Sequence, residues 1–383
     1  MNTTNPISPR KTTANRSQGT NSARAGAGTK PSTLPSDLPL GIEDRLPPIA
    51  FARQQLMTNL LQQFYQQGYD YIDPPLVEYA DSLTHGVGAS ITNNALLVMD
   101  GLSLRPLILR PDMTAGVARI AAEKLATLPR PLRLCYGGDI ITQHLPSGLT
   151  PQRQLTQVGV ELIGHAGAAA DIEILWLLLT SLDGLLTRPL YLDLAMPPLT
   201  NQLLAELSTE VQQRAEALVR HKDGAALRLI DHPAAKLLAA LMMIHGDAAT
   251  VREQLQPHQQ HPAIAAAIER LTIITDWLMP KWNQLHYPPQ LSIDITELNG
   301  FDYKSGFAFT LFDRTSKLTL GRGGRYTIAE SGEAAVGFSL YLDNFLSSVK
   351  NLHTRATTAV ASDDLNRQQQ LLRAGERIAR ILS

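Results

Sequence analysis

Apolar residues in the first ordered part of the chain recur at the spacing of a helix. In the run FARQQLMTNLLQQFYQQGY they fall on one helical face, at Leu56, Leu60, Leu61 and Phe64. Gly68 follows as a stop signal, so we expect one amphipathic helix here. The segment DYIDPPLVEYAD comes next, and Pro74 and Pro75 place it at a sheet edge or a bend.

Strand-like runs follow at residues 95–98 and 104–109, before a second helical pattern in RPDMTAGVARIAAEKLATL. Asp112 and Thr114 stand at the entry to that pattern, where side-chain oxygens commonly cap a helix. The sequence therefore predicts an acid at a helix N-terminus.

A long β-hairpin is predicted from GGDIITQHLPSGLTPQRQLTQVGVELIG, residues 137–164, in which two apolar runs flank a polar loop. Side chains along its second strand alternate between two faces. The apolar face carries Val158, Val160 and Leu162, and the polar face carries Gln157, Gly159 and Glu161. The polar face is either the floor of a pocket or a solvated sheet face, and the strand alone leaves both open.

Residues 196–286 change to helical patterns rich in Leu, Ala and Gln, which predict a helical insertion between two β-rich blocks. Strand alternation returns in LSIDITEL, FAFTLFD and KLTLG, GRGGRY follows between strands, and AVGFSLYLDNFL ends the globular part. Residues 351–383 carry Asp363 and Asp364 as helix-start signals, so we expect a short C-terminal helical segment.

Composition and charge narrow the class of partner. The chain has 383 residues, 44% of them hydrophobic, which is enough for a large core. Its 34 basic and 35 acidic residues are interspersed and give a formal net charge of −1. A polyanion binder normally carries a basic footprint, so we do not expect nucleic acid as a partner.

Cys135 is the only cysteine, which excludes an internal disulfide, a CxxC site and a thiolate zinc site. We therefore expect a reducing compartment, the cytoplasm, and neither a metal nor a cofactor. The longest apolar run, residues 174–182, is about half the ~20 residues that a membrane-spanning helix requires. We expect it to be a core helix and expect no membrane segment.

The first 36 residues are rich in Ser, Thr, Asn, Gly and Ala and have no acid before Asp37. Their basic residues are Arg10, Lys11, Arg16, Arg24 and Lys30. A transit peptide has a similar composition, but this segment lacks the apolar periodicity of an amphipathic helix. We expect residues 1–36 to form a disordered N-terminal tail.

Four blocks occur together along the chain: LRPDMTAGVAR, then LCYGGDI with PQRQLTQVGVELIG, then LNGFDYKSG, and then GRGGRY with AVGFSLYLDNF. GRGGRY alone matches no phosphate-loop pattern and is a weak signal. In this order and spacing the blocks resemble the catalytic domain of histidyl-tRNA synthetase. The resemblance implies, for residues 37–350, an α+β class II aminoacyl-tRNA synthetase-like fold, in which an antiparallel sheet is flanked by helices. Such folds usually dimerise through their first motif, which the segment ending at Pro75 resembles.

In the synthetase, the histidine carboxylate attacks the α-phosphate of ATP, and three arginines stabilise the charge that develops. The resemblance aligns these arginines with Thr142, Asn299 and Asn344 of this chain, and His144 replaces an acid close to the first. Loss of one preorganised donor costs about 10²- to 10³-fold in rate, so we expect no adenylation. Only 37 residues follow Leu346, fewer than the roughly 100 of a typical domain, so we expect no anticodon-binding domain.

The resemblance also implies that the amino-acid pocket is retained. It assigns six residues to histidine binding: Asp112, Thr114, Gln157, Glu161, Tyr303 and Tyr326. Asp112 and Thr114 match the residues at the ligand's ammonium group, and Gln157 and Glu161 match those that line the amino acid and its imidazole. The synthetase has a tyrosine where this chain has Lys304. The alternative is that Asp112 is only a helix-start acid and Glu161 only a sheet-surface acid.

A synthetase-like chain without these arginines and without the anticodon domain resembles the regulatory subunits of ATP phosphoribosyltransferase. This resemblance implies a short-form catalytic subunit as partner, in a hetero-octamer with four of each chain that performs the first step of histidine biosynthesis. It also implies activation of that partner and feedback by L-histidine. Two alternatives remain. An amino-acid ligase with a non-tRNA acceptor would need the arginines, and a sensor of tRNA-like ligands would need a basic groove.

Overall fold

The computed structural model describes residues 38–84, 94–143, 152–301, 303–346, 348–349, 357–361, 364–374 and 377–381. The predicted N-terminal tail, the tip of the hairpin with His144, and Asp363 lie outside these residues.

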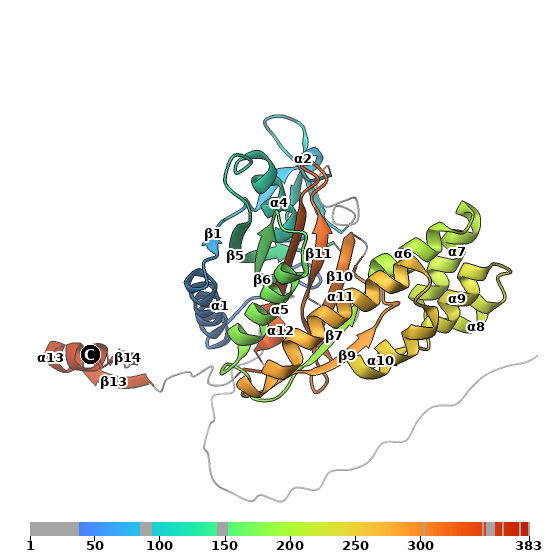
Figure 1. Cartoon of the computed structure of the whole chain (residues 1–383). Helices are drawn as coiled ribbons and strands as arrows, with labels where there is room; N and C mark the ends of the chain where they lie inside the picture. Colours follow the sequence, from blue (N-terminus) through green and yellow to red (C-terminus); the bar gives the residue numbers. More distant parts are fainter. Residues whose placement is uncertain are drawn as a thin grey trace, which may run out of the picture. The chain divides into compact units, whose positions relative to one another are not determined.

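A nine-stranded sheet forms the centre of the fold, in the order β1-β5-β6-β12-β11-β10-β7-β9-β8 (Figure 1). The strands are β1 (Asp70–Tyr71), β5 (Leu132–Ile141), β6 (Gln154–Ile163), β7 (Tyr191–Ala195), β8 (His245–Gly246), β9 (Gln290–Asp294), β10 (Lys304–Asp313), β11 (Leu318–Thr327) and β12 (Ala334–Tyr341). The neighbours from β5 to β7 are antiparallel, as predicted, whereas β1 pairs with β5 and β7 with β9 in parallel.

Helices cover both faces of this sheet. Between the N-terminal segment and residue 346, the helices outside the insertion are α1 (Ile49–Gln66), α2 (Ala80–Thr84), α4 (Met113–Glu123), α5 (Ala168–Leu182) and α12 (Leu342–Phe345), of which α2 packs on a smaller sheet. The apolar sides of α1 and α5 pack in one core with Val158 and Val160. A second core joins α4 to Tyr136 and Tyr326. A small separate sheet has the order β2 (Val77–Tyr79), β4 (Pro106–Leu109), β3 (Leu96–Met99).

The predicted hairpin is formed by β5 and β6, and both of its faces are buried. Tyr136 lies opposite Gly159 in their pairing. On the polar face, Gln157 and Glu161 are 0% and 1% exposed. This face is therefore not solvated, so the structure contradicts the interpretation of a solvated sheet face.

The predicted insertion, residues 196–286, contains a set of short helices. They are α6 (Pro197–Ala205), α7 (Thr209–Arg220), α8 (Gly224–Arg228), α9 (Pro233–Leu241), α10 (Ala248–Leu255), η1 (Gln256–His258), α11 (Pro262–Leu278) and η2 (Met279–Gln284). Side chains cap several of them: Asp247, for example, accepts from Ala249 N and Thr250 N at 3.0 Å each. The apolar faces of these helices belong to the core that also holds α5 and the sheet, so the insertion does not bury a core of its own.

Two segments differ from the prediction. The C-terminal segment is not one helix but β13 (Thr357–Ala361), α13 (Leu365–Arg373) and β14 (Arg377–Ile381), with the two strands paired in parallel. Local periodicity could not reveal this, because the pairing of two strands across an intervening helix leaves no period in either strand. GRGGRY lies inside β11 rather than between strands. A Cβ at Gly323 would lie 2.6 Å from the Gly337 carbonyl oxygen, so close strand packing explains that glycine.

Candidate functional site

The start of α4 is tied to the middle of β6 by the amide of Gln157. Asp112 is the N-cap residue of α4, and its Oδ1 accepts from Thr114 N at 2.7 Å. Gln157 Nε2 donates to the other oxygen, Oδ2 of Asp112, at 2.8 Å, and Gln157 Oε1 accepts from Met113 N at 2.8 Å. Three of the six predicted ligand residues, Asp112, Thr114 and Gln157, are therefore in one hydrogen-bonded group.

Glu161 forms the second polar group of the same face. Its Oε2 accepts from the Tyr326 hydroxyl at 3.1 Å, and its Oε1 accepts from the Tyr136 hydroxyl at 3.3 Å. The Tyr136 hydroxyl also lies 2.9 Å from Ser339 Oγ and 3.4 Å from Thr114 Oγ1, which connects the two groups. Tyr136 and Ser339 were not predicted, although strand alternation places Tyr136 on one face with Gly138 and was a usable signal.

Lys304 enters this site from β10. Its Nζ donates to the Gly324 carbonyl oxygen at 3.3 Å and lies 4.5 Å from the ring centre of Tyr303 and 5.3 Å from that of Tyr326. Those two rings are packed edge to face, with their centres 6.0 Å apart. The structure thus brings Tyr303 and Tyr326 to the Glu161 side of the site, with the Lys304 ammonium group close to both rings.

Burial is the largest influence on the pKa values of Glu161 and Lys304. It raises the pKa of Glu161 to about 7, although the Lys304 charge acts in the opposite direction. Burial lowers the pKa of Lys304 to about 8, although Glu161 and Asp112 act in the opposite direction. The site therefore titrates close to neutral pH.

The three positions where the resemblance places arginines carry no positive charge. Thr142 continues the hairpin: its N donates to the Arg153 carbonyl at 2.9 Å. Asn299 is exposed, and its Nδ2 donates to the Arg220 carbonyl at 3.2 Å. Asn344 is buried in α12 and donates to the Thr319 carbonyl at 2.7 Å.

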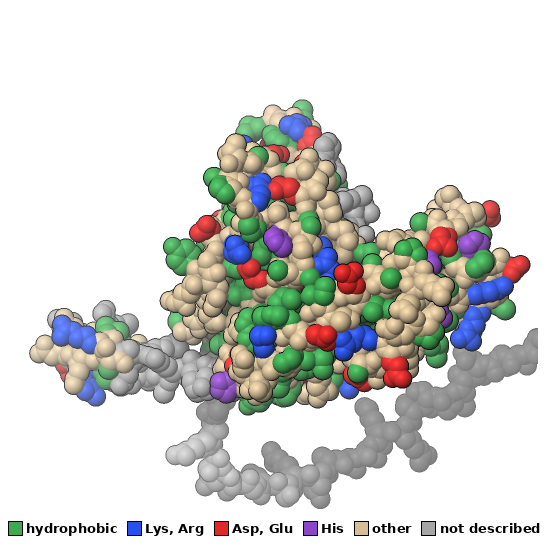
Figure 2. Space-filling view, viewed as in Figure 1, with side chains coloured by type: hydrophobic (Ala, Val, Ile, Leu, Met, Phe, Trp, Pro, Cys, Tyr) green, Lys and Arg blue, Asp and Glu red, His purple; other side chains and the backbone are tan. Residues whose placement is uncertain are grey.

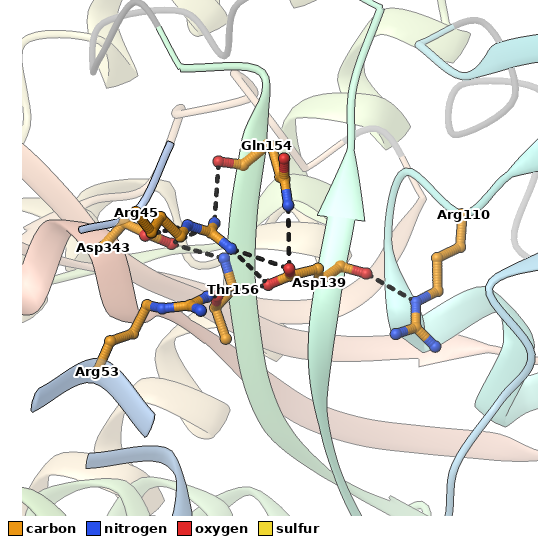
Figure 3. Close-up of polar contacts among 7 residues, drawn as sticks. All are labelled: Arg45, Arg53, Arg110, Asp139, Gln154, Thr156 and Asp343. Atoms are coloured by element: carbon orange, nitrogen blue, oxygen red, sulfur yellow. Dashed lines mark hydrogen bonds and ion pairs between the residues drawn. The ribbon is translucent and has the colours of Figure 1, made fainter. Parts of the chain in front are cut away.

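A charged cluster lies beside Asp139 of the same hairpin (Figure 3). Arg45 NH1 donates to both oxygens of Asp139 at 2.9 Å, Arg53 NH1 bonds Asp139 Oδ1 at 3.0 Å, and Arg45 also pairs with Asp343 at 3.3 Å. Burial opposes ionisation of Asp139, but its bonds with Thr156, Arg45 and Gln154 outweigh burial and lower its pKa. The two arginines and two acids are paired with each other, so the cluster ties α1 and the segment before it to β5 and α12.

Charges on the molecular face seen in Figure 2 are interspersed, without one continuous basic patch. Among the described residues, no group of three or more His, Cys, Asp or Glu side chains could hold a metal ion. Within the same ranges, no helix is long and apolar enough to cross a membrane.

Comparison with known proteins agrees with the resemblance seen in the sequence. The histidyl-tRNA synthetase family matches residues 41–345. A curated relative from Paramagnetospirillum magneticum, named ATP phosphoribosyltransferase regulatory subunit, is 38% identical over 82% of this chain and 81% of its own length. A relative of the same name from Rhodospirillum centenum is 36% identical over 82% of this chain and 80% of its own length.

A solved structure from Bacillus halodurans C, described as an ATP phosphoribosyltransferase regulatory subunit/histidyl-tRNA synthetase, shares the fold. It has a TM-score of 0.76 at 22% identity, and the match covers 92% of this chain and 93% of that chain. The predicted class II synthetase-like fold is thereby confirmed. The curated relatives and the matched family together show that the chain belongs to the histidyl-tRNA synthetase-like family of ATP phosphoribosyltransferase regulatory subunits.

Proposed function

We propose that this chain binds and activates a short-form ATP phosphoribosyltransferase catalytic subunit and carries feedback inhibition by L-histidine. The observation that carries the histidine part is the covered polar site, in which the buried acid Glu161 and the capping acid Asp112 lie on one sheet face. An α-ammonium group and an imidazole are the two hydrogen-bond donors of histidine that such acids would bind.

In the proposed pose, the ammonium group of histidine lies at Asp112 and Thr114, and its imidazole lies further along β6. Gln157 lies beside the ammonium end of the ligand, since its amide donates a hydrogen bond to Asp112. The Glu161 carboxylate would accept from the imidazole N–H, with the rings of Tyr303 and Tyr326 beside it. Lys304 lies within reach of the same space, so the pose differs from that of a synthetase that has a tyrosine ring there.

Two alternative functions have less support. An amino-acid ligase would need cations at Thr142, Asn299 and Asn344, whereas these neutral side chains hydrogen-bond backbone carbonyl oxygens. A sensor of tRNA-like ligands would need a basic groove, whereas the chain's net charge is −1. We therefore propose no nucleic-acid partner, no cofactor, and action in the cytoplasm.

For the assembly we propose a hetero-octamer with four copies of each chain, in which this chain contributes dimers. Exposed apolar side chains lie on α1 and the segment that follows it, which resemble the first synthetase motif: Phe51 is 64% exposed, Tyr65 65% and Tyr71 52%. Such a surface is typical of a protein interface, and two copies of this chain are its proposed occupants.

Reconstitution with a short-form catalytic subunit tests the function. We expect catalytic turnover of ATP and phosphoribosyl pyrophosphate to rise when this chain is added, and we expect L-histidine to inhibit the complex. Co-migration at a defined stoichiometry in sedimentation would support the partnership. A catalytic rate that is unchanged by a saturating amount of this chain would contradict the proposal.

A further inference from the structure

Strand β11 carries two arginines that point to opposite faces of the sheet. Arg325 donates to Asp171 Oδ1 at 2.9 Å and to the carbonyl oxygens of His165 and Gly167, on the face covered by α5. Arg322 is three residues earlier and faces the other way, because side chains alternate along a strand. In the pairing of β11 with β12 it lies opposite Ser339, whose hydroxyl bonds Tyr136. Arg322 is thus on the face of Glu161 and Tyr326.

Arg322 has no ion pair or hydrogen bond within the part of the chain that the structure describes, in contrast to Arg325. Its Nε is buried without a hydrogen-bond partner. A guanidinium group has five donors, and leaving buried donors unpaired is unfavourable. A bound anion would satisfy these donors, so the unpaired state indicates a ligand-binding group rather than a structural one.

The neighbours of Arg322 place its charge at the ligand pocket. A Cβ at Gly300 would overlap the Arg322 guanidinium, so that group lies against the loop after Asn299. Two opposite charges, Asp112 and Arg322, both act on the pKa of the Tyr303 and Tyr341 hydroxyls. Burial raises the pKa of both, Asp112 raises it further, and Arg322 lowers it. Arg322 and Asp112 are therefore both close to these two hydroxyls, one as a positive and the other as a negative charge.

We propose that Arg322 binds the α-carboxylate of an amino-acid ligand whose ammonium group is bound by Asp112. The proposal rests on the proposed histidine site and adds the group that recognises the acid end of the ligand. A zwitterion needs a cation and an anion a few ångströms apart, and a guanidinium can bind a carboxylate through two parallel hydrogen bonds. The three mapped arginine positions are neutral here, so Arg322 supplies the positive charge from a different strand.

The sheet geometry allows this arrangement. The row of opposed residues runs from Tyr136 through Gly159 and Ser339 to Arg322. Gly159 and Arg322 are two strands apart, roughly 10 Å at the backbone. An arginine side chain extends over much of that span, so its guanidinium group can approach a ligand held by the acids beside β6.

The test compares L-histidine with L-histidinol, in which a hydroxymethyl group replaces the carboxylate. Calorimetric titration of the full chain, alone and with the catalytic subunit, gives the ratio of the two affinities. We expect the unmodified chain to prefer histidine by about ten-fold or more, since loss of a charged partner in a desolvated pair is costly. In Arg322→Met the ratio should fall to about one, and Arg322→Lys should retain part of it.

The matched control is Arg314→Met, because Arg314 is exposed and its guanidinium lies 4.4 Å from the Tyr191 ring centre, outside the pocket. Its ratio should stay unchanged, and thermal melts of all variants report whether they fold. A chain that binds no histidine would overturn the proposed function itself. A chain that binds histidine with the same preference over histidinol in Arg322→Met would overturn only the role of Arg322. Competition by inorganic phosphate that depends on Arg322, without any change in that preference, would also overturn the carboxylate assignment.

Discussion

Gly337 lies directly opposite Glu161 in the pairing of β12 with β6, and the absence of a side chain at Gly337 leaves the space that the Glu161 carboxylate occupies. A Cβ at Gly337 would overlap that carboxylate and the Val160 carbonyl oxygen. The backbone of β6 cannot move without disturbing its pairing with β5. The glycine is therefore part of the pocket.

Gly337→Ala should destabilise the chain and weaken histidine binding together. Overpacking of a filled interior typically costs about 1–3 kcal/mol, and displacement of Glu161 removes a ligand contact. Urea unfolding and calorimetric titration measure the two effects. Gly101→Ala is the control, because a Cβ at Gly101 meets nothing within 4 Å. Equal stability of the two variants would contradict this account of Gly337.

Asp112 should have two separable roles, in capping α4 and in binding the ligand. Asp112→Ala removes both, so we expect about 1 kcal/mol loss of stability from the cap and at least about ten-fold weaker histidine binding. Asp112→Ser retains a capping hydroxyl and should recover much of the stability but none of the affinity.

Glu161→Ala should also weaken binding at least about ten-fold. Activation of the catalytic subunit should survive in all three. Unchanged affinity and inhibition in Asp112→Ala and Glu161→Ala would place the feedback site elsewhere.

The pair Glu161 and Lys304 should give stability a minimum near neutral pH. The folded-state pKa of Glu161, about 7, is above the ordinary 4.5, so stability falls as pH rises between those values, by up to about 1.4 kcal/mol per unit. The folded-state pKa of Lys304, about 8, is below the ordinary 10.5, so stability rises again above pH 8.

Lys304→Met should change that profile in a defined way. Without the Lys304 charge the pKa of Glu161 rises further, so the loss of stability continues above pH 7, and the recovery above pH 8 disappears. Urea midpoints from pH 5 to pH 10 report both changes. Lys124→Met, at an exposed position, should follow the unmodified profile. A profile of Lys304→Met that matches this control would refute the coupling.

The chain should show no histidine-dependent ATP–pyrophosphate exchange, because Thr142, Asn299 and Asn344 supply no cation for the transition state. Reintroducing one arginine should not restore the reaction. Asn344→Arg in particular should lose stability, since Asn344 is 2% exposed and its replacement is larger and charged. Exchange above a no-protein control in the unmodified chain would be incompatible with the proposed function.

The isolated chain should sediment as a dimer at micromolar concentration. Phe51→Asp should shift it toward monomer, because Phe51 is exposed on α1, which is part of the proposed contact. Met243→Asp, at a comparably exposed apolar residue of the insertion, should leave the dimer intact. A monomer for the unmodified chain would remove the proposed interface.

Much of the central fold was predictable from local patterns, because hairpins and amphipathic helices have clear periods. Asp112 at the start of a helix is an example, since the cap signal and the apolar spacing agree. The parallel pairing of β7 with β9 was not predictable, because nearly a hundred residues separate the two strands. The β13 and β14 pair was missed although its strands lie close in sequence, because α13 stands between them and the residues of β14 were taken for a continuation of that helix.

The candidate site was predictable as a set of residues, but not as a set of contacts. The bond from Gln157 to Asp112 joins residues 45 apart in sequence, and no periodicity links them. The different partners of Arg322 and Arg325 also follow only from the three-dimensional structure. Alternation places them on opposite faces, but which face is covered by Asp171 depends on the packing of α5.

The ion pair between Arg45 and Asp343 joins residues 298 apart in sequence. β6 likewise obtains its second neighbour only when β12 is present. A nascent chain on the ribosome therefore carries one long unpaired strand edge while residues 164–333 are made, and contacts of such high sequence separation form slowly. Until the last strand of the sheet emerges, Glu161 has neither Gly337 nor Tyr326 beside it. If histidine binds at the proposed site, newly made subunits lack that site, and need protection from aggregation, until synthesis of the sheet is complete.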